Sequence, residues 1–375
     1  MQRYRVPFRA DFVSAHGVER AREGVLIGVE TAGGAVGFGE AAPLPRYTGG
    51  SVEETVEALR TLGLALLGQP PVTAWNIGTD LPGVSAGSAA AARCGIETAS
   101  GDLIARAAGL PFSAWLARRA GGSQSAPLRR VLVNGTVDAG ATASAIDEAQ
   151  SLVARGFRTL KLKVGVDPEA DFERTAAIRE RVGATIALRI DANGGWTVGR
   201  AVHELERYAT LGVTLCEQPI SDLLPGVADR FAEVGRGFAV PIAADESCRS
   251  VADLNCLLAA GDVYAVVIKP MACGLKEALA MLAVAERRGL PVIVTTMFET
   301  GIGVAAAVHL AALLGHRALA CGLATLEHLE DDLIDGGLEI AGGNIAVPRG
   351  AGLGVTVDIE ALTAFATGPR EWVAA

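Results

Sequence analysis

The chain has little cysteine and no excess of positive charge, and each shortage excludes a class of protein. Thirty-three residues are Lys or Arg against 42 that are Asp or Glu, a formal net charge of −9, which argues against a nucleic-acid partner. There is no C-x-x-C pair, so we expect buried thiols in a reducing compartment. The six cysteines are Cys94, Cys216, Cys248, Cys256, Cys273 and Cys321.

Long hydrophobic runs are also missing. The N-terminus, MQRYRVPFRADF, lacks the apolar core of a signal peptide. The longest uncharged apolar stretch near the other end, GIGVAAAVHLAALLG, is too short to span a bilayer. We therefore expect a cytoplasmic protein with no membrane partner. Half of the 375 residues are hydrophobic, enough for a large core.

The chain does have a regular series of ionisable residues, each at the end of a short apolar run. Asp191 closes IALRID, Glu217 closes VTLCE and Asp245 closes VPIAAD. Lys163, at the end of RTLKLK, precedes them, and Lys269, at the end of YAVVIK, follows. Neighbours in the series are 24 to 28 residues apart, the length of one strand plus one covering helix. Because the strands of a β/α barrel end at one face, we expect these side chains to surround one pocket.

Two domains are predicted. Residues 1–125 do not follow the barrel rhythm and indicate an α+β domain, with two strands in 23–43 and helices at 51–68 and 88–109. A Gly-rich linker at 120–127 leads to the barrel, 126–340, and the tail, about 341–375, returns across the first domain. The barrel strands are expected to end near Asn134, Lys163, Asp191, Glu217, Asp245, Lys269, Thr296 and Gly322.

The residue types at these strand ends suit one kind of chemistry. Three carboxylates are the ligands that a hard cation such as Mg²⁺ prefers, and the absence of His or Cys beside them argues against zinc. Such a metal stabilises the dianion formed when a carboxylate loses its α-proton. Lys161 and Lys163 point to the same face of their strand, so two like charges there, near a metal, should lower the pKa of either one. Lys269 would act from the opposite side of the substrate.

Several motifs together resemble the enolase superfamily, muconate-lactonizing enzyme subgroup, over residues 20 to 354. They are GEAAPLP (39–45), KLKVG (161–165), DANGGW (191–196), EQP (217–219), DES (245–247), IKPMACG (268–274) and FETGIG (298–303). The resemblance implies an α/β fold, a (β/α)7β TIM-like barrel with an N-terminal α+β capping domain, and Mg²⁺, with Mn²⁺ as a substitute. It also implies a small carboxylate substrate, and we expect a homo-oligomer.

The resemblance assigns roles by position. Lys163 and Lys269 would be the catalytic acid and base, and Asp191, Glu217 and Asp245 the metal ligands. Further expected contacts with the substrate or its surroundings are Lys161, Asn193, Asn134 and Glu299, with Glu246 supporting the metal site. Specificity is expected from residues 12–24 and 45–51 and from the loop after strand eight.

Within the subgroup, three segments resemble o-succinylbenzoate synthase: HGVERAREG (16–24), VNGTV (133–137) and GLATLEHLEDDLID (322–335). That resemblance implies Mg²⁺-dependent dehydration of 2-succinyl-6-hydroxy-2,4-cyclohexadiene-1-carboxylate in menaquinone biosynthesis, with Lys163 removing the α-proton to give a metal-stabilised enediolate. Dipeptide epimerases usually carry D-x-D at strand eight to hold the substrate ammonium. This chain has Leu323-Ala324-Thr325 there, which favours dehydration. N-acylamino acid racemase, dipeptide epimerase and cycloisomerase activities stay open.

A further hypothesis comes from another class of enzyme, and one motif resembles a site that the sequence does not support. A barrel lysine can form a Schiff base with a carbonyl substrate without a metal, which would make the protein a Schiff-base lyase. Borohydride trapping would favour that chemistry, and inhibition by a chelator would favour the metal. The segment Gly301-Ile302-Gly303 with Ala306 resembles a dinucleotide fingerprint, but no acid follows at the required distance. We interpret it as a tight turn whose helix N-terminus faces an anionic substrate group.

Overall fold

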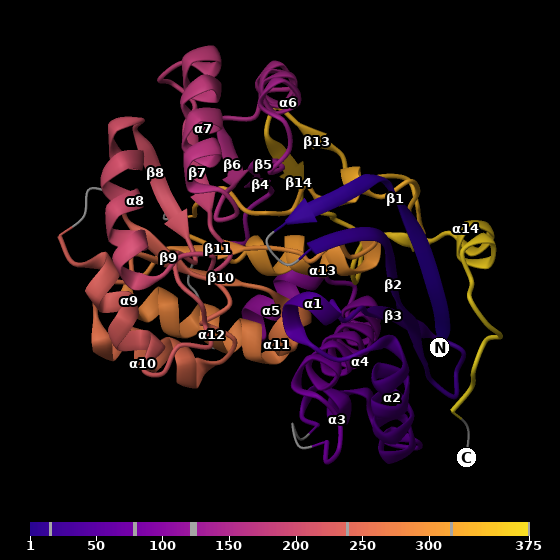
Figure 1. The fold of residues 1–375 in the computed structure, drawn as a ribbon. Helices are drawn as coiled ribbons and strands as arrows, with labels where there is room; N and C mark the ends of the chain where they lie inside the picture. The colour runs from indigo at the N-terminus through magenta and orange to yellow at the C-terminus, as the bar shows by residue number, and fades with distance from the viewer. Residues whose placement is uncertain (15–16, 78–80, 121–125, 238–239, 316–317, 374–375) are drawn as a thin grey trace.

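The computed structural model describes residues 1–14, 17–77, 81–120, 126–237, 240–315 and 318–373. Its N-terminal part is an antiparallel sheet in the order β1-β2-β3, with helices packed against it (Figure 1). The strands are β1 (Gln2–Ser14), β2 (Gly17–Glu30) and β3 (Val36–Ala41). The helices are α1 (Pro45–Thr48), α2 (Val52–Leu66), α3 (Pro71–Trp75), α4 (Ala86–Ala107) and α5 (Phe112–Arg119).

The local signals in this part of the sequence predicted β2, β3, α2 and α4, but not β1, α1, α3 or α5. Helix α2 begins where Ser51 accepts a hydrogen bond from the backbone of Glu54, as expected of an N-cap. Helix α4 lies directly on β3 because glycines remove the side chains between them. A Cβ at Gly37 or Gly39 would collide with the backbone of α4.

The second part is a parallel β/α barrel. Seven strands pair in the order β11-β10-β9-β8-β7-β6-β5, and helices alternate with them along the chain (Figure 1). The strands are β5 (Gly135–Val137), β6 (Thr159–Lys163), β7 (Ala187–Asp191), β8 (Val213–Glu217), β9 (Ile242–Ala244), β10 (Ala265–Ile268) and β11 (Val292–Val294). The helices are α6 (Thr142–Ala154), α7 (Pro168–Val182), α8 (Val198–Thr210), α9 (Val227–Gly235), α10 (Val251–Ala260), α11 (Pro270–Cys273), α12 (Leu275–Arg288) and α13 (Gly301–Ala311).

Two residues close the ring in place of a long eighth strand. Cys321 bridges to Val133 and Gly322 bridges to Thr295, both in parallel. The backbone of Gly322 donates to the carbonyl of Val294 at 3.0 Å and accepts from Thr296 at 3.1 Å. The predicted (β/α)7β barrel with an N-terminal capping domain is therefore confirmed.

The start of the barrel differs from the prediction. Where one strand ending near Asn134 was expected, the chain forms two short strands, one on each side of that residue. Strand β4 (Arg130–Leu132) pairs antiparallel with β14 (Asn344–Ala346), and β5, after Asn134, is the barrel strand that pairs with β6. The strand end that faces the pocket is therefore three residues later than expected.

The C-terminal segment returns to the N-terminal sheet, beside β1 (Figure 1). Tyr4 bridges to Ala366, and the backbone of Arg5 donates to Phe365 at 2.9 Å. The remaining elements are the 3₁₀ turn η1 (Thr325–His328), β12 (Ile334–Asp335), β13 (Ile340–Ala341), β15 (Thr356–Val357) and α14 (Ile359–Ala364).

Packing inside the barrel is apolar on one side and polar on the other. Leu215, Ala243, Ala265, Val267 and Ile293 form a separate buried cluster, as expected of residues that fill a barrel. On β6 and β7 the residues at the corresponding positions are polar. They are Lys161 and Arg189, which are partners in register. Arg189 is buried and donates to the carbonyl of Ala320 at 2.8 Å.

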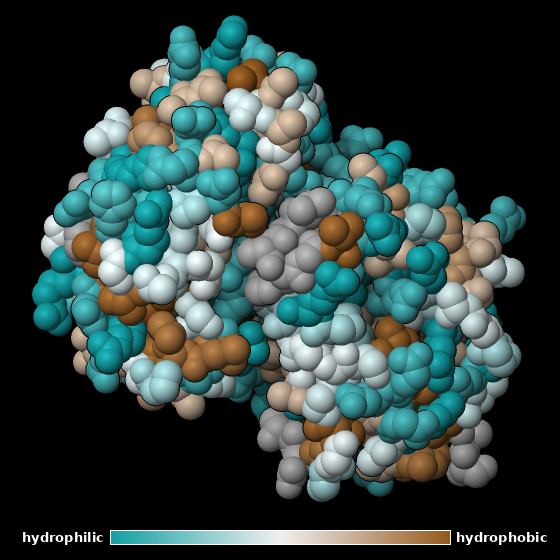
Figure 2. Space-filling view, viewed as in Figure 1, coloured by the Kyte–Doolittle hydropathy of each residue, from teal (hydrophilic) through white to brown (hydrophobic). Residues whose placement is uncertain are grey.

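The surface in Figure 2 is mostly hydrophilic, with hydrophobic residues in separate patches. Leu223 and Trp372 are the most exposed large hydrophobic residues among those described. The cysteines are free, as predicted, and five are buried, whereas Cys256 is exposed. No helix in the described part of the chain is long and apolar enough to cross a membrane.

Candidate active site

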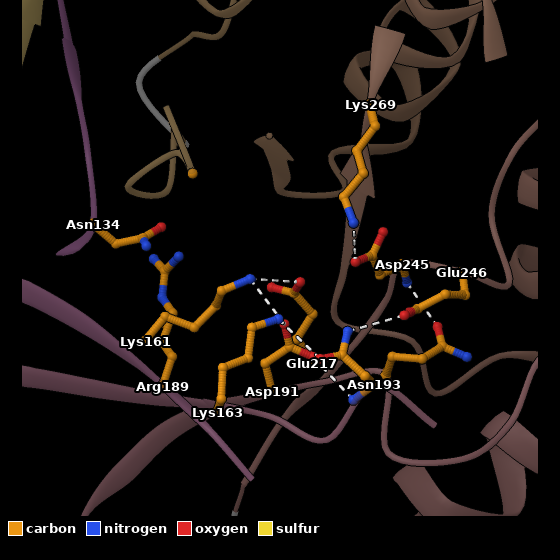
Figure 3. Close-up of polar contacts among 12 residues, drawn as sticks. Asn134, Lys161, Lys163, Arg189, Asp191, Asn193, Glu217, Asp245, Glu246 and Lys269 are labelled. Carbon is orange, nitrogen blue, oxygen red and sulfur yellow. Dashed lines mark hydrogen bonds and ion pairs between the residues drawn. The ribbon is translucent and has the colours of Figure 1, made fainter. Parts of the chain in front are cut away.

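The five ionisable residues of the sequence series lie at one end of the barrel. Lys163 and Asp191 are the last residues of β6 and β7 and are partners in register, as are Asp191 and Glu217. Asp245 and Lys269 directly follow β9 and β10. Figure 3 shows Lys163 and Lys269 approaching the carboxylates from different sides.

Ammonium groups lie between the carboxylates. Lys161 Nζ donates to Asp191 Oδ2 at 2.9 Å and to Glu217 Oε1 at 3.0 Å. Lys163 Nζ donates to the same Asp191 oxygen at 2.7 Å, and Lys269 Nζ donates to Asp245 Oδ2 at 2.5 Å. Both lysines of β6 therefore face the pocket, as their alternation predicted.

The carboxylates do not converge as closely as the sequence suggested. Among the described residues, no three His, Cys, Asp or Glu side chains are grouped so that they could hold a metal ion. The physical reason is that each carboxylate is turned toward a lysine, which offsets its charge. The donor set still fits a hard cation, since Asp191, Glu217 and Asp245 offer oxygen atoms only.

The electrostatics of this group follow from burial and crowding. Burial, together with the nearby Asp191, raises the pKa of Glu217 to about 8. Burial alone would also raise the pKa of Asp191, but Lys161 and Lys163 outweigh it and hold that pKa below its ordinary value. Burial would lower the pKa of Lys161, yet the facing carboxylates raise it. The lowering expected of two lysines beside a metal stays a prediction, since here the facing carboxylates dominate the pKa of Lys161.

Asn193 connects Lys163 to the loop after β9, which carries Asp245 and Glu246. Its Oδ1 accepts from Lys163 Nζ at 2.9 Å, and its Nδ2 donates to Glu246 Oε1 at 3.0 Å. The backbone of Asn193 is left-handed, with φ of 42°, and donates to Asp191 Oδ1 at 3.0 Å. Asn193 thus joins Lys163, Asp191 and Glu246 in one hydrogen-bonded group, and the roles that the resemblance implies for Asn193 and Glu246 stay predictions.

Gln218 fixes the loop that carries Asp245. It has φ of 39°, and its side-chain oxygen accepts from the backbone of Asp245 at 2.9 Å and of Ser247 at 3.3 Å. Left-handed backbone in a residue other than glycine is costly and concentrates at functional sites. The sequence interpretation missed this role of Gln218, although the EQP motif contains it.

A pocket opens over these residues. Its wall includes Lys161, Lys163, Asn193 and Lys269, and the capping domain contributes Glu19, Leu44, Arg46 and Tyr47. Thr136, Thr295, Thr296, Met297, Phe298, Gly322, Ala324, Thr325 and His328 complete it. The segments expected to set specificity thus reach the pocket through Glu19, Arg46 and Tyr47. Residues 15–16, within the first of those segments, lie outside the described residues.

Tyr47 and His328 lie in segments expected to set specificity, but the sequence interpretation did not single out either residue. Tyr47 Oη donates to Asp245 Oδ1 at 2.6 Å and accepts from Lys269 Nζ at 2.6 Å. Burial, followed by the charge of Asp245, raises the pKa of this phenol well above its ordinary value, so it keeps its proton. His328 packs edge-on against Phe298, with ring centroids 5.4 Å apart. Neither residue sits at a strand end, so the strand pattern could not reveal them.

Two expected substrate contacts lie elsewhere. Asn134 is buried and is not part of the pocket wall, because the barrel strand β5 begins only after it, and Thr136 of that strand lines the pocket. Glu299 is also buried away from the wall and accepts from the backbone of Met297 at 2.5 Å. Burial raises the pKa of Glu299 to about 7.

The N-terminus of α13, with its glycine-rich first turn, binds protein carboxylates. Glu40 of β3 accepts from the backbone of Thr300 at 3.0 Å and of Gly303 at 2.9 Å. Asp332 accepts from the backbone of Gly301 at 2.6 Å. Our interpretation that this helix N-terminus faces a substrate group is therefore wrong, since side chains of the chain itself occupy it.

This architecture and these strand-end residues define an enzyme class with a capped (β/α)7β barrel. The chain belongs to the enolase superfamily, because the family described as mandelate racemase / muconate lactonizing enzyme, N-terminal domain, matches residues 3–116. The family described as enolase C-terminal domain-like matches residues 144–362.

Two curated relatives and one solved structure show how the chain relates to known members of the family. It is 33% identical over 356 residues to the hydrophobic dipeptide epimerase of Enterococcus faecalis, covering 94% of this chain and 97% of that protein. It is 38% identical over 250 residues to the o-succinylbenzoate synthase of Thermobifida fusca, covering 64% and 74%. The structure of the Enterococcus faecalis V583 dipeptide epimerase, complexed with Mg and the dipeptide L-Leu-L-Tyr, superimposes with a TM-score of 0.84 at 30% identity, covering 95% of this chain and 98% of that one.

Proposed function

We propose that the protein moves a proton between the two faces of the α-carbon of a carboxylate substrate, and so racemises or epimerises an N-acylated α-amino acid. The observation that carries this proposal is the placement of Lys163 and Lys269 on different sides of the carboxylate group (Figure 3). Two bases on opposite faces are needed for inversion, whereas proton removal alone needs one.

Mg²⁺ is the proposed cofactor, held by Asp191, Glu217 and Asp245. When bound, it would supply positive charge beside the substrate carboxylate as the α-proton leaves. Binding of the cation would also replace the ammonium contacts that these carboxylates now make. Lys161, freed in this way, would pair with the substrate carboxylate.

The two lysines would work as a pair with opposite protonation. One, neutral, takes the α-proton from its face, and the electron pair moves toward the substrate carboxylate. The other, protonated, then returns a proton to the same carbon from the opposite face. One lysine gains the proton that the other loses, so the number of protons on the pair does not change. Exchange of protons with solvent then restores the starting state of each lysine. Asn193, through its contact with Lys163, would keep that amine directed at the carbon.

The wall of the pocket favours an acyl group without an ammonium. Near the end of the eighth strand it presents Gly322, Ala324 and Thr325, and its carboxylate on the capping side, Glu19, lies 3.7 Å from the guanidinium of Arg46. A buried ammonium without a partner costs several kcal/mol. N-acyl amino acids would therefore be better substrates than dipeptides, whose free amino group is charged.

Dehydration to o-succinylbenzoate is the second candidate. It is favoured by the segment 322–335 and by the 38% identity to the Thermobifida fusca synthase. That reaction needs one base, so it would use Lys163 and leave Lys269 as a stabilising charge. The reaction would make the protein a lyase of menaquinone biosynthesis rather than an isomerase.

One assay separates these activities. Purified protein is incubated with Mg²⁺ and, in turn, with enantiopure N-acetyl and N-succinyl amino acids, dipeptides and the cyclohexadiene acid, and kcat/KM is measured for each. The proposal expects the highest value for an N-acyl amino acid and loss of that activity with a chelator. The highest value for the cyclohexadiene acid would replace the proposal by the lyase, and the highest value for a dipeptide would refute the argument from the pocket wall.

A further inference from the structure

Tyr47 reaches the active site from the capping domain, whereas the lysines and carboxylates of the site belong to the barrel. It lies in α1, and its hydroxyl joins Lys269 and Asp245, at 2.6 Å from each. Lys269 Nζ also lies 4.0 Å from the centre of the Tyr47 ring, close enough for a cation–π contact. The tyrosine thus touches the lysine through both its oxygen and its ring.

The segment that carries Tyr47 is fixed from two directions. On the barrel side, Arg249 donates to the Tyr47 carbonyl at 3.4 Å and to Asp222 at 3.2 Å. On the capping side, the backbone of residues 48–49 lies against the first turn of α4, where Gly87 leaves no room for a side chain. These contacts hold the phenol at the lysine.

The two lysines differ in what holds them. Lys163 donates to Asp191 and Asn193, both of the barrel. Lys269 donates to Asp245 of the barrel and to Tyr47 of the capping domain. Among the residues that the structure describes, the capping domain therefore holds the amine of Lys269 and not that of Lys163.

We infer that Tyr47 is a positioning residue that orients Lys269, and that removal of its hydroxyl impairs proton transfer at the Lys269 face only. This inference rests on the proposed two-lysine function. It assigns to α1 a part in the chemistry, in addition to any contact with the substrate. Tyr47→Phe keeps the ring and its contact with the ammonium and removes the oxygen that accepts from it.

Exchange of the α-hydrogen with D₂O, followed by proton NMR on each enantiomer of an N-acyl amino acid separately, measures each face. The Lys269→Ala variant identifies the enantiomer whose exchange depends on Lys269. Tyr47→Phe should slow exchange of that enantiomer about tenfold, the effect of losing one hydrogen bond to a charged group, and leave the other within about twofold. Tyr264→Phe is the matched control. Tyr264 directly precedes β10, the strand before Lys269, and is half exposed, so this substitution should change the exchange of neither enantiomer.

Equal slowing for both enantiomers would overturn the inference, because it would place the effect on Asp245 or on substrate binding. A second readout does not depend on the proposed function. Reductive methylation followed by peptide mass spectrometry should show Lys269 labelled at least about twofold faster relative to Lys163 in Tyr47→Phe, since an oxygen that restrains the ammonium is gone. An unchanged labelling ratio would refute the role of Tyr47, whereas absence of exchange in the wild type would refute the proposed function.

Discussion

At the scale of single residues, the alternation of side chains along each strand decides what the site contains. Lys161 and Lys163 both face the pocket because they are two positions apart on β6, and both bond to the same oxygen of Asp191. This part of the site could be predicted from sequence, because the charged residues end apolar runs. The contacts of Tyr47 and His328 could not be predicted from sequence, because their positions depend on how separate elements pack together.

Asp191→Asn tests the metal site. Asp191 is fully buried between two lysines, and its loss as a charged ligand should weaken Mg²⁺ binding by at least about tenfold. Isothermal titration of the purified protein measures this directly. Asp262→Asn is the matched control, because Asp262 is exposed and its left-handed backbone (φ 61°) suits asparagine. Unchanged affinity in Asp191→Asn would remove this residue from the ligand set.

Glu299 gives the stability of the fold a predictable pH dependence. Burial raises its pKa to about 7, Arg22 opposes the rise and Glu40 adds to it. Between its ordinary pKa and about 7, the unfolded chain ionises this group while the folded chain keeps the proton, so stability falls as pH rises through that window. The glutamine of Glu299→Gln does not ionise in this range. The variant should therefore lose less free energy of unfolding than the wild type between pH 5 and pH 8, by an amount of the order of 2 kcal/mol.

Urea unfolding of wild type and Glu299→Gln at the two pH values measures that difference. Glu180→Gln, on the exposed face of α7, should follow the wild type at both. If Glu299→Gln also follows the wild type, the side chain is not a buried acid in the folded protein.

At the scale of elements, the sequence predicted local structure better than long-range pairing. The ends of β6, β7 and β8 coincide with Lys163, Asp191 and Glu217, since each apolar run is a buried parallel strand. The position of the first barrel strand was predicted wrongly, because β4 pairs with β14, about 210 residues away. No local sequence pattern indicates such a distant partner. The helix α13 was recognised, but its cap, Glu40, comes from the other domain.

Glu40→Ala tests the importance of that cap. Glu40 is buried and accepts from the hydroxyl of Tyr4 as well as from the first turn of α13. Its removal leaves buried donors without acceptors, which should lower the free energy of unfolding by roughly 2–4 kcal/mol. Glu180→Ala, on an exposed helix face, should change it by about 0.5 kcal/mol or less. Equal effects of the two substitutions would show that the cap contributes little.

At the scale of the whole molecule, the barrel supplies the charged groups and the capping domain supplies part of the wall. The class of fold and the five strand-end residues could be predicted because they repeat along the chain with one period. The substrate could not be predicted, because the pocket wall combines residues of both domains. Leu44 and Arg46 come from the capping domain, and Met297 and Phe298 come from the barrel. That combination arises only when the two domains pack, and sequence spacing does not encode it.

The central claim is that Lys163 and Lys269 serve opposite faces of one carbon, and proton exchange in single-lysine variants tests it most directly. Each enantiomer of an N-acyl amino acid is incubated in D₂O with Lys163→Ala or Lys269→Ala, and loss of the α-hydrogen is followed by NMR. We predict that both variants lose racemisation by ~10²–10⁴-fold or more, and that each still exchanges one enantiomer, a different one in each variant. Exchange of both enantiomers by either variant, or of the same enantiomer by both, would contradict the account.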